Sequence, residues 1–318
     1  ARASATGGLA HNSSTPNRGA TTGTARSASA GQWCVGFSGS DHGSGHADPG
    51  MRSHSGGQVS GWARATGSQT SAQPSTSAAS TARTSTSHWG NVPRQRTIVS
   101  MELTHFGHSC LLASFPGATA GQTSTILFDP GIFSHGFEGI TGLSAILVTH
   151  QHPDHADPQR LPALVEANPG AALYADPATA AQLGGAWRAV HAGDQFGIDG
   201  LTVRGMGGRH AVIHPEIPVI DNISYVVGDD EHAARLMHPG DALFVPDEDV
   251  HVLATPAAAP WMKISEAVDY LRAVAPTHAV PIHQGIIAPE ARGIFYGPLT
   301  EMTDTDFRVL PEESSVPL

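Results

Sequence analysis

The composition of the chain changes sharply near Met101, and this change limits which residues can fold. Residues 1–100 contain a single leucine, Leu9, and a single isoleucine, Ile98, and consist mainly of Ser, Thr, Gly, Ala and Arg. Such a segment cannot bury enough apolar surface to offset the entropy lost on ordering. We therefore expect residues 1–100 to be a disordered low-complexity extension, native or not, and the folded domain to span residues 101–318. A transit peptide or a solvated linker is a weaker interpretation, because no helical amphipathicity joins the arginines.

The charges divide at the same boundary. Residues 1–100 hold eight arginines against Asp41 and Asp48, a net charge of +6. Because the whole chain has a formal net charge of −11, the remaining residues carry −17. An acidic folded part disfavours nucleic acid as a partner, and we expect a small-molecule substrate instead.

Cysteine content and hydropathy bear on the compartment. Cys34 and Cys110 are the only cysteines, which predicts no disulfide framework and favours a reducing compartment, by default the cytoplasm. No apolar run approaches the roughly 20 residues that span a bilayer, so we expect no membrane insertion. The oligomeric state is left open, and a homo-oligomer is compatible with the sequence.

After Met101, short apolar segments alternate with Gly, Pro and Asp, a pattern typical of strands and turns. The strands that this pattern predicts cover residues 103–106, 110–115, 125–128, 145–149, 172–175, 250–254 and 278–282, with a further strand-rich stretch over 195–237. Helices are predicted at residues 158–167, 177–183 and 264–275. Because strands come in runs and helices lie between or after them, we expect two sheets with helices on their outer faces.

Three histidines and one aspartate follow the predicted buried strand 145–149 within six positions. They are His150, His152, Asp154 and His155, and a rigid strand would hold these ligand-type side chains in place at little entropic cost. The alternative is a solvated turn, since Pro153 and Asp154 are ordinary turn residues.

Further ligand-type residues argue against a simple turn. His210, Asp241 and His283 each follow another predicted strand, where a sheet could bring their side chains to the same place. The sequence therefore predicts a metal site built from several strand ends.

These residues, in this order, resemble the motifs of the metallo-β-lactamase superfamily. Three further segments are similar to its branch of cytoplasmic metal-dependent hydrolases that includes ascorbate-6-phosphate lactonase, namely LTHFGHS at 103–109, FDP at 128–130 and PIH at 281–283. The resemblance covers residues 101–318. It implies an αββα sandwich, an α/β (four-layer α+β) fold of two mixed β-sheets with helices on the outer faces.

The resemblance also implies a role for each ligand-type residue. It assigns one metal ion to His150, His152 and His210, and a second ion to Asp154, His155 and His283. Asp241 would bridge the two ions, and Asp129, at a strand end, would support the site without contacting the ions.

A pair of divalent ions about 3.5–4 Å apart can lower the pKa of a shared water and polarise a carbonyl or phosphoryl oxygen. We therefore expect a hydrolase that uses a metal-bridging hydroxide to cleave an ester, lactone or phosphodiester-type bond, with Asp154 as its candidate catalytic residue. Imidazole and carboxylate ligands suit zinc, and manganese or iron is compatible. The alternatives are an iron-containing redox enzyme of the same fold and a non-catalytic metal-binding module.

Other residues have open assignments. His214 is an alternative ligand to His210, and His238 belongs either to the surroundings of the ligands or only to its turn. His105 and His108 are predicted to face either the core or the substrate. Trp261, before the last predicted helix, is expected to pack in the core rather than to line the substrate mouth.

Overall fold

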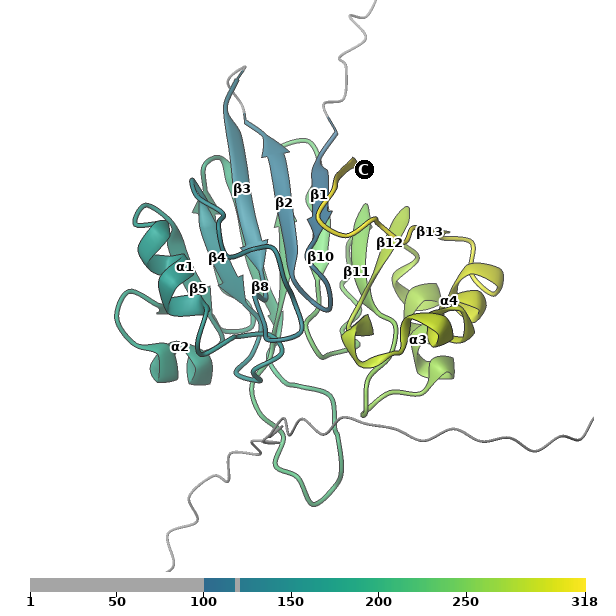
Figure 1. Ribbon diagram of the computed structural model, residues 1–318. Helices are drawn as coiled ribbons and strands as arrows, with labels where there is room; N and C mark the ends of the chain where they lie inside the picture. Colours follow the sequence, from purple (N-terminus) through teal and green to yellow (C-terminus); the bar gives the residue numbers. More distant parts are fainter. Residues whose placement is uncertain (1–99, 118–120) are drawn as a thin grey trace, which may run out of the picture. The chain divides into compact units, whose positions relative to one another are not determined.

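The computed structural model describes residues 100–117 and 121–318. The predicted extension at residues 1–100 therefore lies, apart from its last residue, outside the described residues, and the predicted domain boundary stays a prediction. Residues 100–318 contain two seven-stranded sheets (Figure 1).

The first sheet has the strand order β14-β1-β2-β3-β4-β5-β6. Neighbours from β14 to β3 are antiparallel, and neighbours from β3 to β6 are parallel. Its strands are β1 (Glu102–His105), β2 (Leu111–Pro116), β3 (Thr123–Phe128), β4 (Ala145–Val148), β5 (Ala172–Ala175), β6 (Arg188–Ala189) and β14 (Ser315–Pro317).

The second sheet repeats this mixed pattern in the order β13-β12-β11-β10-β9-β8-β7. Neighbours from β13 to β10 are parallel, and neighbours from β10 to β7 are antiparallel. Its strands are β7 (Gln195–Ile198), β8 (Leu201–Gly207), β9 (Ile223–Gly228), β10 (Leu236–His238), β11 (Val252–Pro256), β12 (His278–Ile282) and β13 (Asp306–Phe307).

Apolar clusters show how the layers pack. Residues of both sheets, such as Phe128 and Tyr225, form one buried cluster between them. Leu161 and Leu164 of α1 (Leu161–Ala167) and Ala180 of α2 (Pro177–Leu183) pack on the outer face of the first sheet. Helix α3 (Ile264–Val274) and Leu299 of α4 (Arg292–Glu301) cover the second sheet. The predicted αββα sandwich is confirmed, with the helix pairs on opposite sides of the strands (Figure 1).

Two helices depart clearly from the predictions. Helix α1 begins at Leu161, not at residue 158, because the Asp157 carboxylate accepts hydrogen bonds from the backbone N–H groups of Gln159 and Arg160 and holds a turn there. Helix α4 was not predicted, because Gly293, Gly297 and Pro298 make its sequence a poor helix former.

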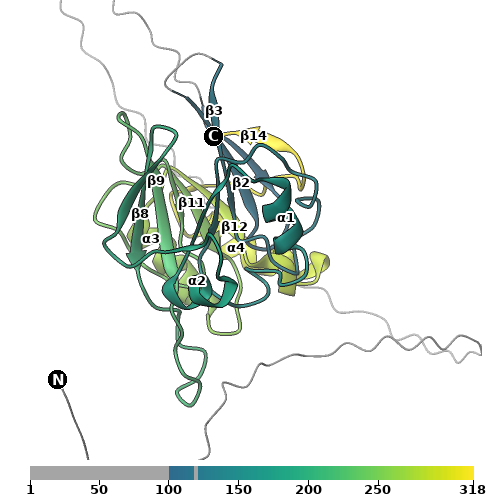
Figure 2. The same ribbon diagram turned by 90° about the vertical axis from the view of Figure 1, so that its left-hand side faces the viewer.

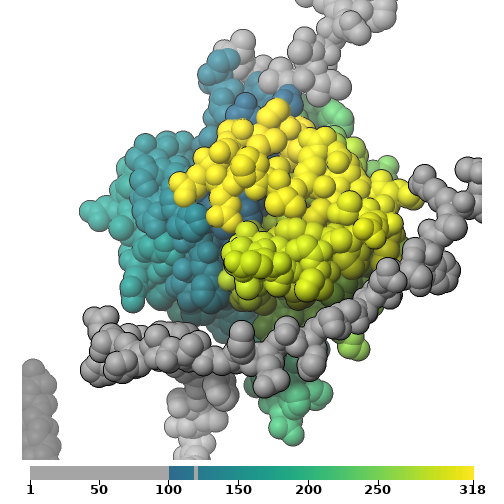
Figure 3. Space-filling model, turned by 45° about the vertical axis from the view of Figure 1, so that its right-hand side comes forward, coloured from purple at the N-terminus to yellow at the C-terminus, as the bar shows by residue number. Residues whose placement is uncertain are grey.

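The C-terminal residues complete the first sheet. Strand β14 pairs with β1, and the Leu318 N–H donates to the Met101 carbonyl at 2.8 Å. Figure 3 shows these C-terminal residues, in yellow, beside the blue residues of the first strands. The described part of the chain contains no helix that is long and apolar enough to cross a membrane.

Candidate metal centre

Eight ligand-type side chains converge where loops leave the ends of the strands. The loop after β4 supplies three histidines and one aspartate, and the loops after β1, β8, β10 and β12 supply one residue each. These side chains form two groups, and within each group the possible ligand atoms all lie within 4.8 Å of one another. The first group is His150, His152, His210 and Asp241, and the second group is His108, Asp154, His155 and His283. All seven residues that the sequence singled out as ligands are thus brought together, and His108 joins them.

Asp241 lies between the two groups. Its Oδ2 atom is 3.3 Å from His210 Nε2 in the first group and 3.2 Å from His283 Nε2 in the second, and its Oδ1 atom is 3.1 Å from His155 Nε2. A carboxylate with atoms directed at both groups has the geometry needed to bridge two cations.

A hydrogen bond from Nδ1 fixes which nitrogen of His155 faces the centre. Its Nδ1–H donates to Asp129 Oδ2 at 2.7 Å, which turns Nε2 toward Asp241 Oδ1 at 3.1 Å. Asp129 is fully buried and also accepts from the backbone N–H and the hydroxyl of Thr149, at 2.7 and 2.8 Å. The structure therefore places Asp129 behind the ligands, tying the start of the ligand loop to His155.

Three more histidines have the same orientation. Because the Thr149 hydroxyl gives its proton to Asp129, its oxygen accepts from His150 Nδ1–H at 3.0 Å. His210 Nδ1–H donates to the Ala211 carbonyl at 2.6 Å, and His283 Nδ1–H donates to the Ala258 carbonyl at 2.7 Å. The Nε2 atoms of His210 and His283 have no hydrogen-bond partner, and His150 Nε2 contacts His152 Nδ1 at 3.1 Å. Outer hydrogen bonds of this kind orient metal-bound imidazoles in general.

His108 has the opposite arrangement. Its Nδ1 atom accepts the Gly285 backbone N–H at 3.2 Å, so its Nε2–H donates to Asp154 Oδ2 at 3.1 Å. A nitrogen that carries a proton cannot ligate a metal, and His108 therefore orients Asp154 rather than completing the ligand set. His238 is arranged in the same way, accepting from the Gly240 N–H and donating to the Ser109 carbonyl, and it stacks on Phe128.

Burial and charge set the protonation states. Burial lowers the pKa of His150 well below its usual value, so this imidazole stays neutral. Burial alone would also lower the pKa of His155, but the carboxylates of Asp241 and Asp129 raise it well above its usual value. Conversely, burial would raise the pKa of Asp241, and the neighbouring His155 and His283 hold it well below the usual range. Without a cation, the negative charges of Asp129 and Asp241 thus favour a second proton on His155. A bound cation would neutralise the same carboxylates and replace that proton.

Buried atoms without hydrogen bonds test whether cations fit this site. His155 Nε2, His210 Nε2, His283 Nε2 and Asp241 Oδ1 are all buried and all lack a hydrogen-bond partner. Leaving a buried polar atom unpaired costs about 1–3 kcal/mol, and nearly all such atoms in proteins are paired. Nitrogen and oxygen donors of this kind are those that zinc, manganese and iron accept, so the residues present fit a pair of divalent cations.

Asp241 is held by residues outside the ligand loops. Its backbone N–H donates to Asn222 Oδ1 at 3.0 Å, and the Trp261 indole N–H donates to its Oδ2 atom at 3.0 Å. Gly240, with φ +61°, adopts the left-handed conformation before it, and a Cβ there would lie 2.6 Å from Thr149 Cβ. The sequence predicted only a packing role for Trp261, whereas its indole N–H also positions the candidate ligand Asp241.

Residues 102–283 match the β-lactamase superfamily domain, which is more than half of the chain. The chain is also 76% identical over 216 residues to Protein Rv0786c of Mycobacterium tuberculosis, which corresponds to 68% of this chain and 99% of that protein. The chain belongs to the metallo-β-lactamase superfamily.

Solved structures of this superfamily share the fold. Igni18, a metallo hydrolase from Ignicoccus hospitalis, is 20% identical with a TM-score of 0.53, covering 69% of this chain and 98% of its own. CmlA, a diiron β-hydroxylase from Streptomyces venezuelae, is 15% identical with a TM-score of 0.50, covering 69% of this chain and 54% of its own. At these identities the likeness extends to the metallo-β-lactamase fold alone.

The other histidines among the described residues lie outside both groups. His214, the alternative to His210, is exposed, and its Nδ1 accepts the Glu216 backbone N–H in a turn. His105 is buried and contacts the His108 carbonyl and Gln284. The sequence left His108 undecided between core and substrate, and only its proximity to Asp154 in the fold assigns it to the centre.

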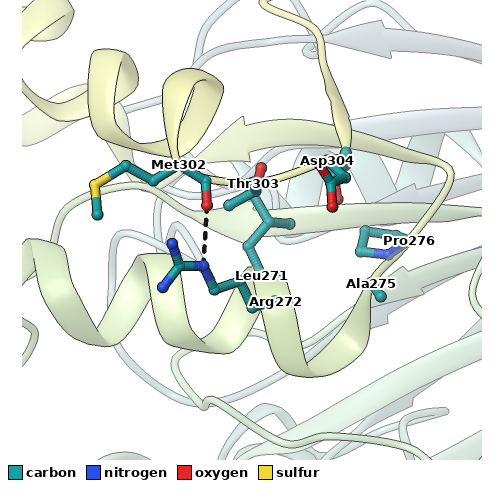
Figure 4. A pocket seen from close by; sticks show the side chains of 8 residues that line it. Leu271, Arg272, Ala275, Pro276, Met302, Thr303 and Asp304 are labelled. Carbon is teal, nitrogen blue, oxygen red and sulfur yellow. Dashed lines mark hydrogen bonds between the residues drawn. The ribbon is translucent and has the colours of Figure 1, made fainter.

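One hollow of this metallo-β-lactamase fold has no ligand-type histidine. It is a cleft of about 180 Å³ between the C-terminal ends of α3 and α4, where Arg272 Nε donates to the Met302 carbonyl at 2.9 Å (Figure 4). None of the eight clustered residues lines it.

Proposed function

We propose that the chain is a metal-dependent hydrolase that cleaves an ester, lactone or phosphodiester-type bond of a small molecule. The observation that carries this proposal is the convergence of three unpaired imidazole Nε2 atoms on Asp241, a carboxylate shared by the two ligand groups. Such an arrangement is costly without cations and well suited to two of them.

When bound, two divalent cations supply an activated water at neutral pH and polarise the carbonyl or phosphoryl oxygen of the substrate. The residues of the chain provide the positions for this chemistry. His150, His155, His210 and His283 present Nε2 lone pairs in fixed orientations, so no side chain must reorganise during the reaction.

Asp154 is the candidate for direct contact with the reacting water. Its side chain is 20% exposed, against 4% for Asp241, so it faces the open side of the centre. Burial would raise its pKa, but the hydrogen bond from His108 and the nearby His155 hold that pKa below its usual range. Asp154 therefore stays ionised, held by His108, and can accept a hydrogen bond from a water on the open side.

Zinc is our proposed metal, since the donors are imidazole nitrogens and carboxylate oxygens without thiolate. The same donor set is compatible with iron, and the fold likeness to a diiron β-hydroxylase keeps an iron-dependent oxidation as the second candidate. Elemental analysis and the visible absorption spectrum distinguish the two candidates.

The sequence likeness to the ascorbate-6-phosphate lactonase branch makes lactones a substrate class to test within this proposal. Support for it comes from the LTHFGHS segment, which contains His108, the residue that orients Asp154. A lactone and an open-chain ester differ only in whether the two products stay joined, and the same centre can hydrolyse both.

The test compares two histidines in one loop. We expect the purified full chain to bind about two divalent ions and to hydrolyse at least one of a set of lactones, phosphodiesters and thioesters. His210→Ala removes an Nε2 atom that lies 3.3 Å from Asp241, so it should lower the metal content below that of the unaltered chain and lower activity by at least tenfold.

The matched control is His214→Ala, four residues away and exposed, which should keep the metal content of the unaltered chain. Equal metal content in the His210→Ala and His214→Ala proteins, or no divalent metal in the unaltered chain, contradicts the proposal.

A further inference from the structure

Large apolar side chains are exposed around the metal centre. Ten large hydrophobic residues are exposed among those that the structure describes, and six of them lie in three segments next to candidate ligands. These six are Ile132 and Phe133 after β3, Val212, Ile213 and Ile217 after β8, and Ile286 after β12. Exposed apolar side chains gathered in one place mark a binding surface more often than scattered ones do.

On one side, the apolar surface is continuous with the second ligand group. The Phe133 ring lies 5.3 Å from the His108 ring, which lies 4.2 Å from the His283 ring. A Cβ on Gly285 would be 3.1 Å from Phe133 Cβ, so Phe133 packs directly beside the segment that carries Ile286. Phe133 is 48% exposed and Ile286 is 44% exposed.

On the other side, the connection between β8 and β9 extends the surface from the first ligand group. Val212 and Ile213 follow His210 almost directly, and the Ala211 N–H donates to the Asp241 carbonyl at 2.8 Å. Figures 1 and 2 both show this connection, in green, projecting beyond the ends of the strands. Val212 and Ile213 lie two and three residues after His210 and are 57% and 39% exposed.

Trp261 lies near both ligand groups. Its ring lies 6.1 Å from the His210 ring and 6.4 Å from the His283 ring, and the residue is half-buried. The indole N–H is already used by Asp241, so the ring can offer a substrate only its apolar surface.

We propose that this surface binds an aliphatic acyl chain, and that the substrates are carboxylic esters or lactones with an extended apolar part. This inference rests on the proposed hydrolase function. A second protein chain seated on the surface would cover Asp154, the more accessible carboxylate of the centre. An acyl chain instead lies along the apolar side chains while its ester carbonyl reaches the centre. In the reaction, water adds its oxygen to the acyl carbon and the acyl–oxygen bond breaks, giving a carboxylate, an alcohol and a proton.

The test measures chain-length preference with the metal-loaded full chain and p-nitrophenyl esters of acetate, butyrate and octanoate. We expect kcat/KM to rise roughly two- to fourfold for each added methylene that is buried. In the double variant Val212→Ser/Ile213→Ser, the octanoate-to-acetate ratio of kcat/KM should fall at least fivefold. Ile294→Ser is the control, because Ile294 is 66% exposed on α4, and it should keep the ratio of the unaltered chain.

Binding of the free carboxylates gives a second readout that needs no turnover. Calorimetry should show octanoate binding more tightly than acetate, with the difference reduced in the double variant. If esters are hydrolysed without any chain-length preference, the inference is overturned while the hydrolase function stands. If no metal binds, the hydrolase function fails and the inference fails with it. A dimer that the double variant converts to monomer, with the chain-length ratio unchanged, overturns the inference in favour of a second copy of the chain.

Discussion

Five of the six clustered histidines divide by what their Nδ1 atoms contact. Nδ1–H donates to an oxygen in His150, His155, His210 and His283, which leaves Nε2 for a cation. In His108, Nδ1 accepts a backbone N–H, so Nε2 carries the proton and donates to Asp154. The same residue type thus serves as ligand or as hydrogen-bond donor, according to one neighbouring backbone group.

Removing His108 should therefore weaken metal binding without removing a ligand. His108→Ala leaves Asp154 without its donor, and we expect the affinity of the weaker of the two metal sites to fall about 10- to 100-fold. His108→Gln keeps an N–H near the position of Nε2 and should restore most of that affinity. Metal titration against a chelating dye measures both variants.

His135→Ala is the control for this comparison, because His135 is exposed and pairs with Glu312 and Glu313 instead. If His108→Gln binds metal as weakly as His108→Ala, His108 acts as a ligand or through packing, and the assignment of its proton is wrong.

Among the elements, the connection between β3 and β4 sets the position of the ligand loop. The Ile132 N–H donates to the Pro153 carbonyl at 2.9 Å, and Gly131 packs against the backbone of Asp154. A Cβ on Gly131 would lie 1.7 Å from the Asp154 carbonyl oxygen, where the backbone leaves no room for it. Glycine is required here by close approach rather than by its backbone dihedrals.

Gly131→Ala should displace the ligand loop. We expect a loss of about 1–3 kcal/mol in the free energy of unfolding and weaker metal binding, because backbone must move to admit the methyl group. Urea unfolding and metal titration measure the two effects.

Gly139→Ala in the same connection meets nothing within 4 Å and should be neutral or slightly stabilising. Equal behaviour of the two variants would show that residues 150–155 do not depend on this contact.

For the whole molecule, the buried histidines predict how stability depends on pH in the metal-free protein. Burial lowers the pKa of both His105 and His108 to about 4, while an unfolded chain protonates histidine near pH 6.5. The unfolded state therefore binds more protons in this window, and stability falls as the pH drops from about 6.5 to 4, by up to about 3 kcal/mol for each histidine. The pKa of His155 is raised in the folded protein, so at the acid end of this pH range His155 is protonated in both the folded and the unfolded state. It therefore does not offset the loss of stability.

Urea unfolding of chelator-treated protein between pH 7 and pH 4.5 measures this dependence. His105→Gln should reduce the slope of unfolding free energy against pH, whereas His214→Gln, at an exposed position, should leave it unchanged. A slope that His105→Gln does not alter would place the acid sensitivity elsewhere.

Much of the molecule followed from local sequence patterns. The strand at β12 and the helix α2 were predicted with the bounds that the structure has, because alternating or continuous apolar runs and turn residues are local signals. The clustering of His150, His152, Asp154 and His155 was visible in the sequence because these residues share one short loop. The candidate ligands from other loops were found because each follows a predicted strand.

Tertiary structure decided what depends on distant neighbours. Helix α4 forms although its glycines and proline disfavour it, because Leu299 is buried in the cluster that also holds α3. Three features of the centre depend on groups far apart in the chain. They are the proximity of His210, rather than His214, to Asp241, the proton on His108 Nε2, and the hydrogen bond from Trp261 to Asp241. A sequence specifies which donors and acceptors exist, but their directions are fixed only when the two sheets pack and bring the strand ends together.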